Sequence, residues 1–600
     1  MPLNRWATGA HSRRHVSANP FASDWLRTGR DEVRRPRGDA SYVAGATDDP
    51  LKFLTIPALL DRAVARHGAR EAVIYAPTCE RLSWYDLKRR SDDIAAGLLA
   101  LGVQRGDRVG IWAPNCVEWL LVQFGTARIG AILVNINPAY RVTELEYALN
   151  KVQCRVLVMA ARLKSSDYIA MMKSLAPELE TSACSQPLRT GRFPHLERVV
   201  LIDGATPLSG MLSFKELTTL AGPAHRKRLP ELGAALDPDD AINIQFTSGT
   251  TGSPKGATLS HYNIVNNARY SGKAMRLSER DRLCIPVPLY HCFGMVLGVL
   301  TCTTTGAAMV FPGVSFDAEE TLRAVQEHRC TALHGVPAMF IAQLEHPRLR
   351  SYDSTSLRTG IMAGAPCPVE VMRRVISDMH MSEVTIGYGM TETSPISFQS
   401  SPDDPLERRV STVGRVQPHV EVKIVDPHGR IVPVGRGGEL CTRGYLVMHG
   451  YWDDPAHTHE SIDAAGWMHS GDLATLDADG YCNIVGRVKD MLIRGGENVF
   501  PREIEDYLYR HPKVLEAQVF GVPDAKLGEE ICAWIVLRPG TNATDDEVKD
   551  FCRGQIAHYK VPRYVRFVTD LPKTVTGKAQ KFAMREAMIQ ELGLLAPKTA

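Results

Sequence analysis

The sequence lacks the marks of several common protein classes. Its 600 residues carry a net charge of only +3, and no dense basic stripe is interleaved with aromatic residues, so nucleic-acid binding is not expected. The thirteen cysteines include no C-x-x-C pair and mostly stand in apolar surroundings, which is typical of reduced core residues in an intracellular protein. No H-E-x-x-H, no Cys/His cluster at zinc spacing and no Ser–His–Asp arrangement is evident, so neither a zinc enzyme nor a hydrolase is supported.

Long apolar runs are absent as well. The least polar stretch, residues 295–311, contains four threonines and two glycines. It is shorter and more polar than the run of about 20 apolar residues that crosses a membrane. We therefore predict no transmembrane segment.

Acidic residues are missing from the start of the chain. None precedes Asp24, whereas Arg5, Arg13 and Arg14 do, and this composition is typical of mitochondrial transit peptides. A disordered tail, or a start codon assigned too far upstream, explains the same composition and is our first choice. That choice places the protein in a bacterial cytoplasm, whereas a transit peptide would place it in the mitochondrial matrix.

Helical and strand patterns alternate along most of the chain. Residues 83–101 have the cap and the apolar spacing of an amphipathic helix, and residues 107–114 follow as a short strand. This alternation recurs, and it predicts mostly parallel, buried strands joined by helical crossovers. From about Pro418, short alternating strands separated by turns predict a small barrel-like β subdomain.

The pattern changes again after residue 486. A glycine-rich turn, a helix, two strands and a further helix predict a small, mobile α+β C-terminal domain. The predicted fold class is therefore α/β, with layered α/β subdomains and the β subdomain in the large N-terminal domain. We expect an N-terminal extension over residues 1–48, a large domain over 49–486 and a C-terminal lid domain over 487–600.

The most specific segment is TSGTTGSPKG, from Thr247 to Gly256, which follows an apolar strand-like run. Hydroxyls and backbone N–H groups of a glycine-rich turn can bind phosphate oxygens, and Lys255 adds positive charge. A Walker A loop requires glycine immediately before its lysine, and that position is Pro254 here. The segment is therefore a phosphate-binding candidate of another kind.

This segment resembles the phosphate loop of the adenylate-forming superfamily, which comprises acyl-CoA synthetases, peptide-synthetase adenylation domains and luciferases. Further motifs follow in the order of that superfamily, over roughly residues 50–590: GAP from Gly364, YGMTET from Tyr388, SGD from Ser470, GR from Gly486 and PKTVTGK ending at Lys578. The resemblance implies a ligase that activates a carboxylic acid as its acyl-adenylate, with ATP, coenzyme A and Mg²⁺ as cofactors. It makes residues 49–486 an AMP-binding domain.

The resemblance also assigns roles in the first half-reaction. Thr391 contacts the α-phosphate, and Glu392 and Thr247 are the implied Mg²⁺ ligands. Lys578, which on composition alone is a solvated surface charge, reaches the substrate carboxylate and the α-phosphate. The implied phosphate-loop residues are Thr247, Ser248, Gly249, Thr250, Thr251, Gly252 and Lys255. The implied nucleotide contacts are Gly364, Ala365, Pro366, Tyr388, Gly389, Asp472 and Arg487.

A second half-reaction at the same site needs a second arrangement of the domains. Lys489 occupies the hinge position of the superfamily. Gly495 and Gly496 are implied to line the tunnel for the pantetheine arm, because glycine lets a narrow thiol chain approach closely. Ordinary glycines at the start of a helix are the alternative for this pair.

The acid substrate is implied by the segment around His291, an aromatic gate of the acyl pocket, with Phe293, Val336 and Met339 as apolar lining. The longest local matches resemble medium-chain fatty acyl-CoA ligases and their bacterial counterparts, so a medium-chain fatty acid is the first choice. An adenylation domain that loads a carrier protein, and a non-catalytic nucleotide- or fatty-acid-sensing module, are the alternatives. The oligomeric state stays open between monomer and homo-oligomer.

Overall fold

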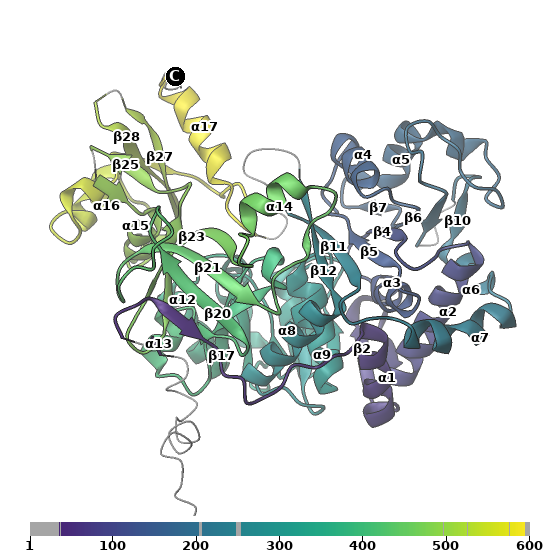
Figure 1. Cartoon of the computed structure of the whole chain (residues 1–600). Coiled ribbons are helices and arrows are strands. Elements are labelled where there is room, and N and C mark those ends of the chain that lie inside the picture. Colours follow the sequence, from purple (N-terminus) through teal and green to yellow (C-terminus); the bar gives the residue numbers. More distant parts are fainter. Residues whose placement is uncertain are drawn as a thin grey trace, which may run out of the picture.

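The computed structural model describes residues 35–36, 38–202, 207–247, 254–495, 497–524, 526–574 and 577–594. Figure 1 shows two α/β layers, a β subdomain and a C-terminal part along the chain. The predicted phosphate-loop residues Ser248, Gly249, Thr250, Thr251 and Gly252, and the tunnel residue Gly496, lie outside the described residues. None of the helices in the described ranges has the length and the apolar character that crossing a membrane requires.

The first α/β layer is an eight-stranded sheet in the order β10-β9-β6-β4-β5-β11-β12-β22. Its strands are mostly parallel, and those at its centre, such as β5 and β6, are buried at every position. Helix α3 (Val117–Arg128) packs on β4 and β5, and α2 (Trp84–Ala100) packs on α3 and on strands of the second sheet. The strand bounds are Met211–Ser213 (β10), Arg198–Leu201 (β9), Val156–Met159 (β6), Arg108–Trp112 (β4), Ile132–Asn135 (β5), Ala241–Thr247 (β11), Lys255–Ser260 (β12) and Gly450–Tyr451 (β22).

The second layer is a nine-stranded sheet in the order β19-β18-β17-β16-β15-β13-β14-β2-β3. Helices α8 (His261–Ala274), α10 (Ala318–Glu327), α11 (Pro337–Leu344) and α12 (Val369–Asp378) belong to this part of the chain. The strand bounds are Arg415–Val416 (β19), Ile396–Gln399 (β18), Glu383–Gly389 (β17), Thr359–Ala363 (β16), Ala332–Leu333 (β15), Arg282–Cys284 (β13), Ala308–Phe311 (β14), Glu71–Tyr75 (β2) and Glu80–Ser83 (β3).

The β subdomain is an antiparallel sheet in the order β1-β20-β21-β23-β24. Its strand bounds are Tyr42–Ala44 (β1), Val420–Val425 (β20), Gly438–Gly444 (β21), Met468–Leu476 (β23) and Cys482–Arg487 (β24). Buried and partly exposed residues alternate along β23, as expected for a sheet with one covered face. The predicted α/β class with a small β subdomain is confirmed.

Strand β1 lies within residues 1–48, the range predicted as an N-terminal extension. Tyr42–Ala44 pair with Lys423 to Glu421 on β20, and the Val43 side chain is 1% exposed. The short strand is stabilised by pairing with β20, which is far away in the sequence. The local residue pattern of Tyr42–Ala44 therefore does not predict the strand.

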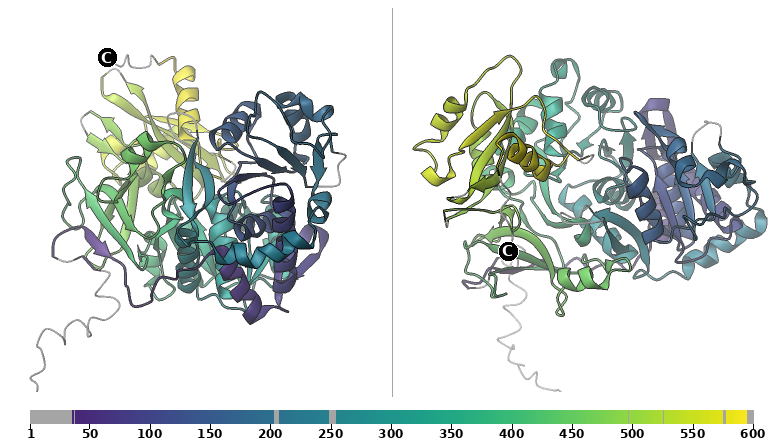
Figure 2. Two further views of the ribbon diagram at one scale, coloured as in Figure 1. Left: turned by 45° about the vertical axis from the view of Figure 1, so that its right-hand side comes forward. Right: turned by 90° about the horizontal axis from the view of Figure 1, so that it is seen from above.

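The C-terminal part has hydrophobic clusters of its own. One cluster draws all its buried members from residues 492–552, and Figure 2 shows this part as a lobe beside the larger body. The bounds are Leu492–Arg494 (β25), Glu497–Val499 (β26), Pro501–Leu508 (α15), Val514–Asp524 (β27), Gly528–Leu537 (β28), Asp545–Cys552 (α16), Tyr564–Phe567 (β29) and Lys581–Glu591 (α17). The predicted boundary near Arg487 stays a prediction.

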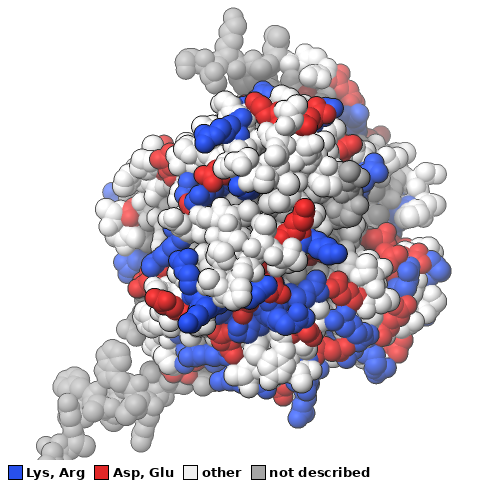
Figure 3. Space-filling view, turned by 90° about the vertical axis from the view of Figure 1, so that its right-hand side faces the viewer, with Lys and Arg blue, Asp and Glu red and all other residues white. Residues whose placement is uncertain are grey.

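The surface carries charges of both signs. Figure 3 shows one face of the molecule, on which lysine and arginine side chains are interspersed with aspartate and glutamate. Ion pairs such as Arg155–Asp107, at 2.6 Å, contribute to this pattern. Such a mixed surface agrees with the small net charge of the chain.

Candidate active site

The motif YGMTET lies at the end of the parallel strand β17. Gly389 is its last residue, and a Cβ atom there would lie 1.8 Å from the carbonyl oxygen of Pro395, so only glycine fits this close approach. Thr391 and Glu392 follow in a short 3₁₀ turn and are 8% and 5% exposed. Polar groups at the carboxyl end of a parallel strand are typical of ligand sites in α/β folds.

Asp472 lies opposite this motif and joins two of the predicted residues. The hydroxyl of Tyr388 donates to Asp472 Oδ2 at 2.7 Å, and Arg487 Nε lies 3.2 Å from Oδ1. Asp472 on β23 is directly opposite Arg487 on β24 in the sheet register. Burial, reinforced by the negative charge of Asp472, raises the pKa of Tyr388 well above its usual value, so the phenol stays protonated and donates.

Glu392 is held by Tyr451, which the sequence analysis missed. The Tyr451 hydroxyl donates to Glu392 Oε1 at 2.9 Å, and Lys255 Nζ lies 5.0 Å from the centre of the Tyr451 ring. The contact arises because β22 pairs with β12, with Tyr451 opposite Ala257. Burial, and then the charge of Glu392, raises the pKa of Tyr451. One aromatic side chain thus links the predicted phosphate-binding lysine to the predicted metal ligand.

Thr247 lies at the edge of the same region. It ends β11 and is opposite Lys255 in the register of the β11–β12 pair, and its hydroxyl donates to the Lys255 carbonyl at 3.4 Å. Thr247 is therefore tied to Lys255. Among the described residues, no interaction joins Thr247 to Glu392, the other predicted metal ligand.

Lys578 comes from the C-terminal part and lies within range of the charges of Asp472 and Glu392. Its backbone N–H donates to Thr574 Oγ1 at 3.1 Å, and a Cβ at the preceding Gly577 would lie 2.8 Å from Val336, so the turn is pressed against the larger body. Desolvation lowers the pKa of Lys578, and the charge of Arg487 acts in the same direction, whereas Asp472 and Glu392 oppose them. Because the side chain also reaches solvent, we expect the ammonium to remain charged near neutral pH.

His291 lies next to this cluster as a neutral ring. Its Nδ1 accepts the backbone N–H of Phe293 at 3.1 Å, which leaves the proton on Nε2. Burial lowers the pKa of His291 to about 3, and the positive charge of Lys578 contributes. The neighbouring Cys292 Sγ is 3.7 Å from Thr391 Oγ1, so His291 and the YGMTET motif share one wall.

The predicted acyl-pocket residues are buried together in the apolar core. Phe293 begins the π-helix η3 (Phe293–Leu300), and its ring centre lies 5.3 Å from that of His334. Val336 and Met339, at the start of α11, are 4% and 5% exposed and belong to the same hydrophobic cluster as Phe293. An apolar acid chain is the ligand that these side chains suit.

The remaining predicted residues fall into two groups. Gly364 follows β16 with φ +87°, a conformation that favours glycine, and Ala365 and Pro366 continue on the partly exposed turn. Lys489 lies in the exposed turn after β24, and Gly495 donates to Leu527 at 2.8 Å within the C-terminal part. The structure thus brings Lys578, Glu392 and Asp472 together and places Lys489 and Gly495 at the start of the C-terminal part.

Comparison with known proteins gives family matches over both parts. The family described as AMP-binding enzyme matches residues 60–452, and the one described as AMP-binding enzyme C-terminal domain matches residues 503–578. The mitochondrial medium-chain acyl-CoA ligase ACSF2 of Danio rerio is 48% identical over 93% of this chain and 92% of its own length. YngI of Bacillus subtilis (strain 168) is 48% identical over 90% of this chain and 98% of its own length.

A solved structure supports the same arrangement. The anthranilate CoA ligase AuaEII in complex with anthranoyl-AMP aligns with a TM-score of 0.80 at 27% identity, covering 91% of this chain and 99% of that one. The alignment extends over both the larger body and the C-terminal part.

The neutral state of His291, a partly buried ring, predicts a pH dependence of stability. Its folded-state pKa of about 3 is below the usual 6.5, so the unfolded chain binds the proton first and stability is lost as the pH falls below about 6.5. His291→Gln should retain about 2 kcal/mol of the stability that the wild type loses between roughly pH 7 and 5. Urea unfolding at the two pH values measures this, and equal losses in both proteins would contradict a neutral His291.

Proposed function

Because this chain belongs to the AMP-binding enzyme family, we propose that it is an AMP-forming ligase for a medium-chain fatty acid and coenzyme A. A carboxylate oxygen of the acid attacks the α-phosphorus of ATP, the bond to the β-phosphate breaks, and pyrophosphate leaves. The thiol of coenzyme A then attacks the acyl carbon of the adenylate, and AMP leaves. The observation that carries this proposal is that Lys578, from the C-terminal part, lies within range of the charges of Glu392 and Asp472.

Lys578 supplies positive charge at the reacting atoms. In-line attack gathers negative charge on the carboxylate and the α-phosphate, and a fixed cation lowers the energy of that state. Asp472 and Glu392 act on Lys578 as counter-charges, and Arg487 reaches the same place from β24. These charge interactions support a role for Lys578 in adenylation because they link the C-terminal part to groups of the larger body.

The donor set around Glu392 fits Mg²⁺. Its carboxylate is buried, keeps one oxygen on the Tyr451 hydroxyl and lies beside the Thr391 hydroxyl in the same turn. Oxygen ligands of this kind are those Mg²⁺ prefers. When bound, Mg²⁺ neutralises charge on the phosphates of ATP. Glu392 and Thr247 would hold the ion, Thr391 would contact the α-phosphate, and Lys255 would contact the other phosphates.

Asp472 and Tyr388 suit the nucleoside. The Asp472 carboxylate, already in contact with Arg487, can accept both ribose hydroxyls, and the Tyr388 ring offers a face for the adenine. Gly364 and the exposed turn after it leave room for the base to approach. Ala365, Pro366 and Gly389 complete the proposed nucleotide contacts.

Thioester formation requires the C-terminal part, proposed as residues 487–600, to rotate about Lys489 against residues 49–486. The separate hydrophobic clusters of the C-terminal part support such a movement, because it can turn without breaking its own core. The turn that begins at Gly495 would then come to the site and form the pantetheine tunnel together with Gly496.

The substrate proposal rests on the apolar wall and on the relatives. His291 is neutral, and Phe293, Val336 and Met339 are apolar, so an acid with an uncharged chain fits best. The Danio rerio relative is named a medium-chain acyl-CoA ligase. For the location of this protein, the mitochondrial name of the Danio rerio relative supports the mitochondrial matrix. The bacterial source of YngI supports a bacterial cytoplasm, which stays our first choice.

Replacing the lysine separates the two half-reactions. Lys578→Ala should reduce pyrophosphate release from acid and ATP by at least about 100-fold, a loss of about 3 kcal/mol of transition-state stabilisation. The same variant should largely retain thioester formation from a supplied acyl-adenylate, because that step does not use this charge.

The matched control is Lys526→Ala, which removes an exposed lysine from a turn of the same lobe. It should leave both half-reactions unchanged. Equal loss of both half-reactions in Lys578→Ala would refute the proposed role.

The contact between Tyr451 and Glu392 predicts a changed metal dependence. Tyr451→Phe keeps the ring near Lys255 but removes a hydrogen bond to a carboxylate, which is worth about 1.5–3 kcal/mol. The Mg²⁺ concentration for half-maximal pyrophosphate release should rise about tenfold or more. Tyr481→Phe is the control, because Tyr481 donates to Asp404 at 2.8 Å in the same manner elsewhere. If both variants keep the Mg²⁺ dependence of the wild type, the assignment of Glu392 as the metal ligand is wrong.

A further inference from the structure

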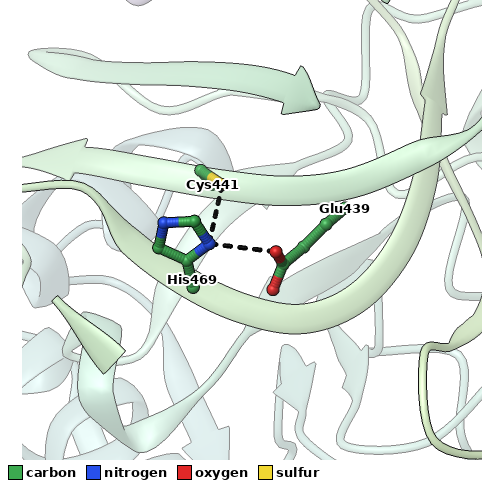
Figure 4. A group of neighbouring side chains, drawn as sticks. All are labelled: Glu439, Cys441 and His469. Carbon is green, nitrogen blue, oxygen red and sulfur yellow. Dashed lines mark hydrogen bonds and ion pairs between the residues drawn. The ribbon is translucent and has the colours of Figure 1, made fainter. Parts of the chain in front are cut away.

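Three side chains of types that can bind metal ions converge in the β subdomain, and none of them belongs to the proposed ATP site. Glu439 and Cys441 lie on β21, and His469 lies on β23, where it pairs directly with Cys441. Figure 4 shows the three side chains pointing toward one another, and one ligand atom of each lies within 4.8 Å of the other two. We propose that Glu439, Cys441 and His469 form a binding site for one Zn²⁺ ion.

The distances agree with tetrahedral coordination. Cys441 Sγ and His469 Nδ1 are 3.5 Å apart, and zinc bonds of usual length place sulfur and nitrogen ligands about 3.5 Å apart. His469 Nδ1 and Glu439 Oε2 are 2.9 Å apart. Around zinc this edge is about 3.3 Å, so it would lengthen by about 0.4 Å when the ion binds.

A carboxylate lies near the second nitrogen of the histidine. Asp463 Oδ2 is 3.9 Å from His469 Nε2, which is within ion-pair range but longer than a hydrogen bond. A metal-bound imidazole commonly directs its remaining N–H at a carboxylate, which fixes the ring and raises its basicity. His469 is thus oriented with Nδ1 toward the proposed ion.

The donor set favours zinc over the other common ions. Ca²⁺ and Mg²⁺ prefer oxygen ligands, whereas one thiolate, one imidazole and one carboxylate are typical of Zn²⁺. A deprotonated Cys441 and Glu439 balance the two charges of the ion. Binding of Zn²⁺ would replace the proton of the Cys441 thiol.

The site is open to an incoming ion. Only the Cys441 side chain is buried, whereas those of His469 and Glu439 are 33% and 27% exposed. The other oxygen of Glu439 accepts the backbone N–H of Gly471 at 3.1 Å, next to Asp472. A bound ion would therefore hold His469 directly and Gly471 through Glu439, and so restrict the movement of the segment from His469 to Asp472.

Zinc binding is measured on the full chain, stripped of metal by a chelator and dialysed against Zn²⁺. We expect about one ion per chain by elemental analysis. We also expect Co²⁺ to give the visible spectrum of a tetrahedral site with a thiolate-to-metal band, which reports the sulfur ligand directly. Cys441→Ser should abolish that band and weaken zinc binding by at least about tenfold.

Two further variants complete the test. Cys482→Ser, in a buried cysteine on the adjacent strand β24, should bind zinc as the wild type does. Glu439→Gln keeps an acceptor for the Gly471 N–H and should weaken zinc binding as Cys441→Ser does. It replaces Cys441→Ser in the test if the cysteine variant does not fold. Wild-type protein that retains no zinc, or a thiolate band that survives in Cys441→Ser, would overturn the proposal. Because the readout is metal content, a failure leaves the ligase proposal untouched.

Discussion

One carboxylate, that of Asp472, connects the parts of the molecule on which the proposed activity depends. Tyr388 brings the end of the second α/β sheet to it, and Arg487 brings the last strand of the β subdomain. Its charge also acts on Lys578 of the C-terminal part. Because Asp472 is 9% exposed, these interactions lie in a poorly solvated place, where charges act strongly on one another.

The charged side chains around Asp472 together suit a nucleotide with its metal ion. Cations from three segments, Lys255, Arg487 and Lys578, approach a region that also contains two carboxylates. Triphosphate adds negative charge and Mg²⁺ adds positive charge, so this arrangement suits a nucleotide with its ion. The neutral His291 and the apolar side chains beside it continue the same surface toward a ligand without charge. A single region thus offers a charged half for ATP and an uncharged half for the acid.

Much of the fold could be predicted from the sequence, because the central strands are buried along their length and read as short apolar runs between helical patterns. The resemblance carried by the ordered motifs also predicts that Thr391, Glu392, Asp472 and Lys578 lie in one site. Tyr451 could not be found in this way, since its contact with Glu392 depends on the pairing of β22 with β12. Register likewise brings His469 opposite Cys441, although the two are far apart in the sequence. The pairing of β1 with β20 could not be predicted for the same reason. The neutral state of His291 depends on desolvation in the folded protein, which the local sequence does not indicate.

Activation of the acid on the α-phosphate of ATP can be followed with heavy oxygen. Fatty acids of graded chain length, each with heavy oxygen in the carboxylate, are supplied together with ATP, Mg²⁺ and coenzyme A. We expect medium-chain acids to give the highest kcat/KM, and each acyl-CoA formed to be matched by one AMP carrying one heavy oxygen. Formation of ADP, label in pyrophosphate rather than AMP, or no turnover with any acid would contradict this activation.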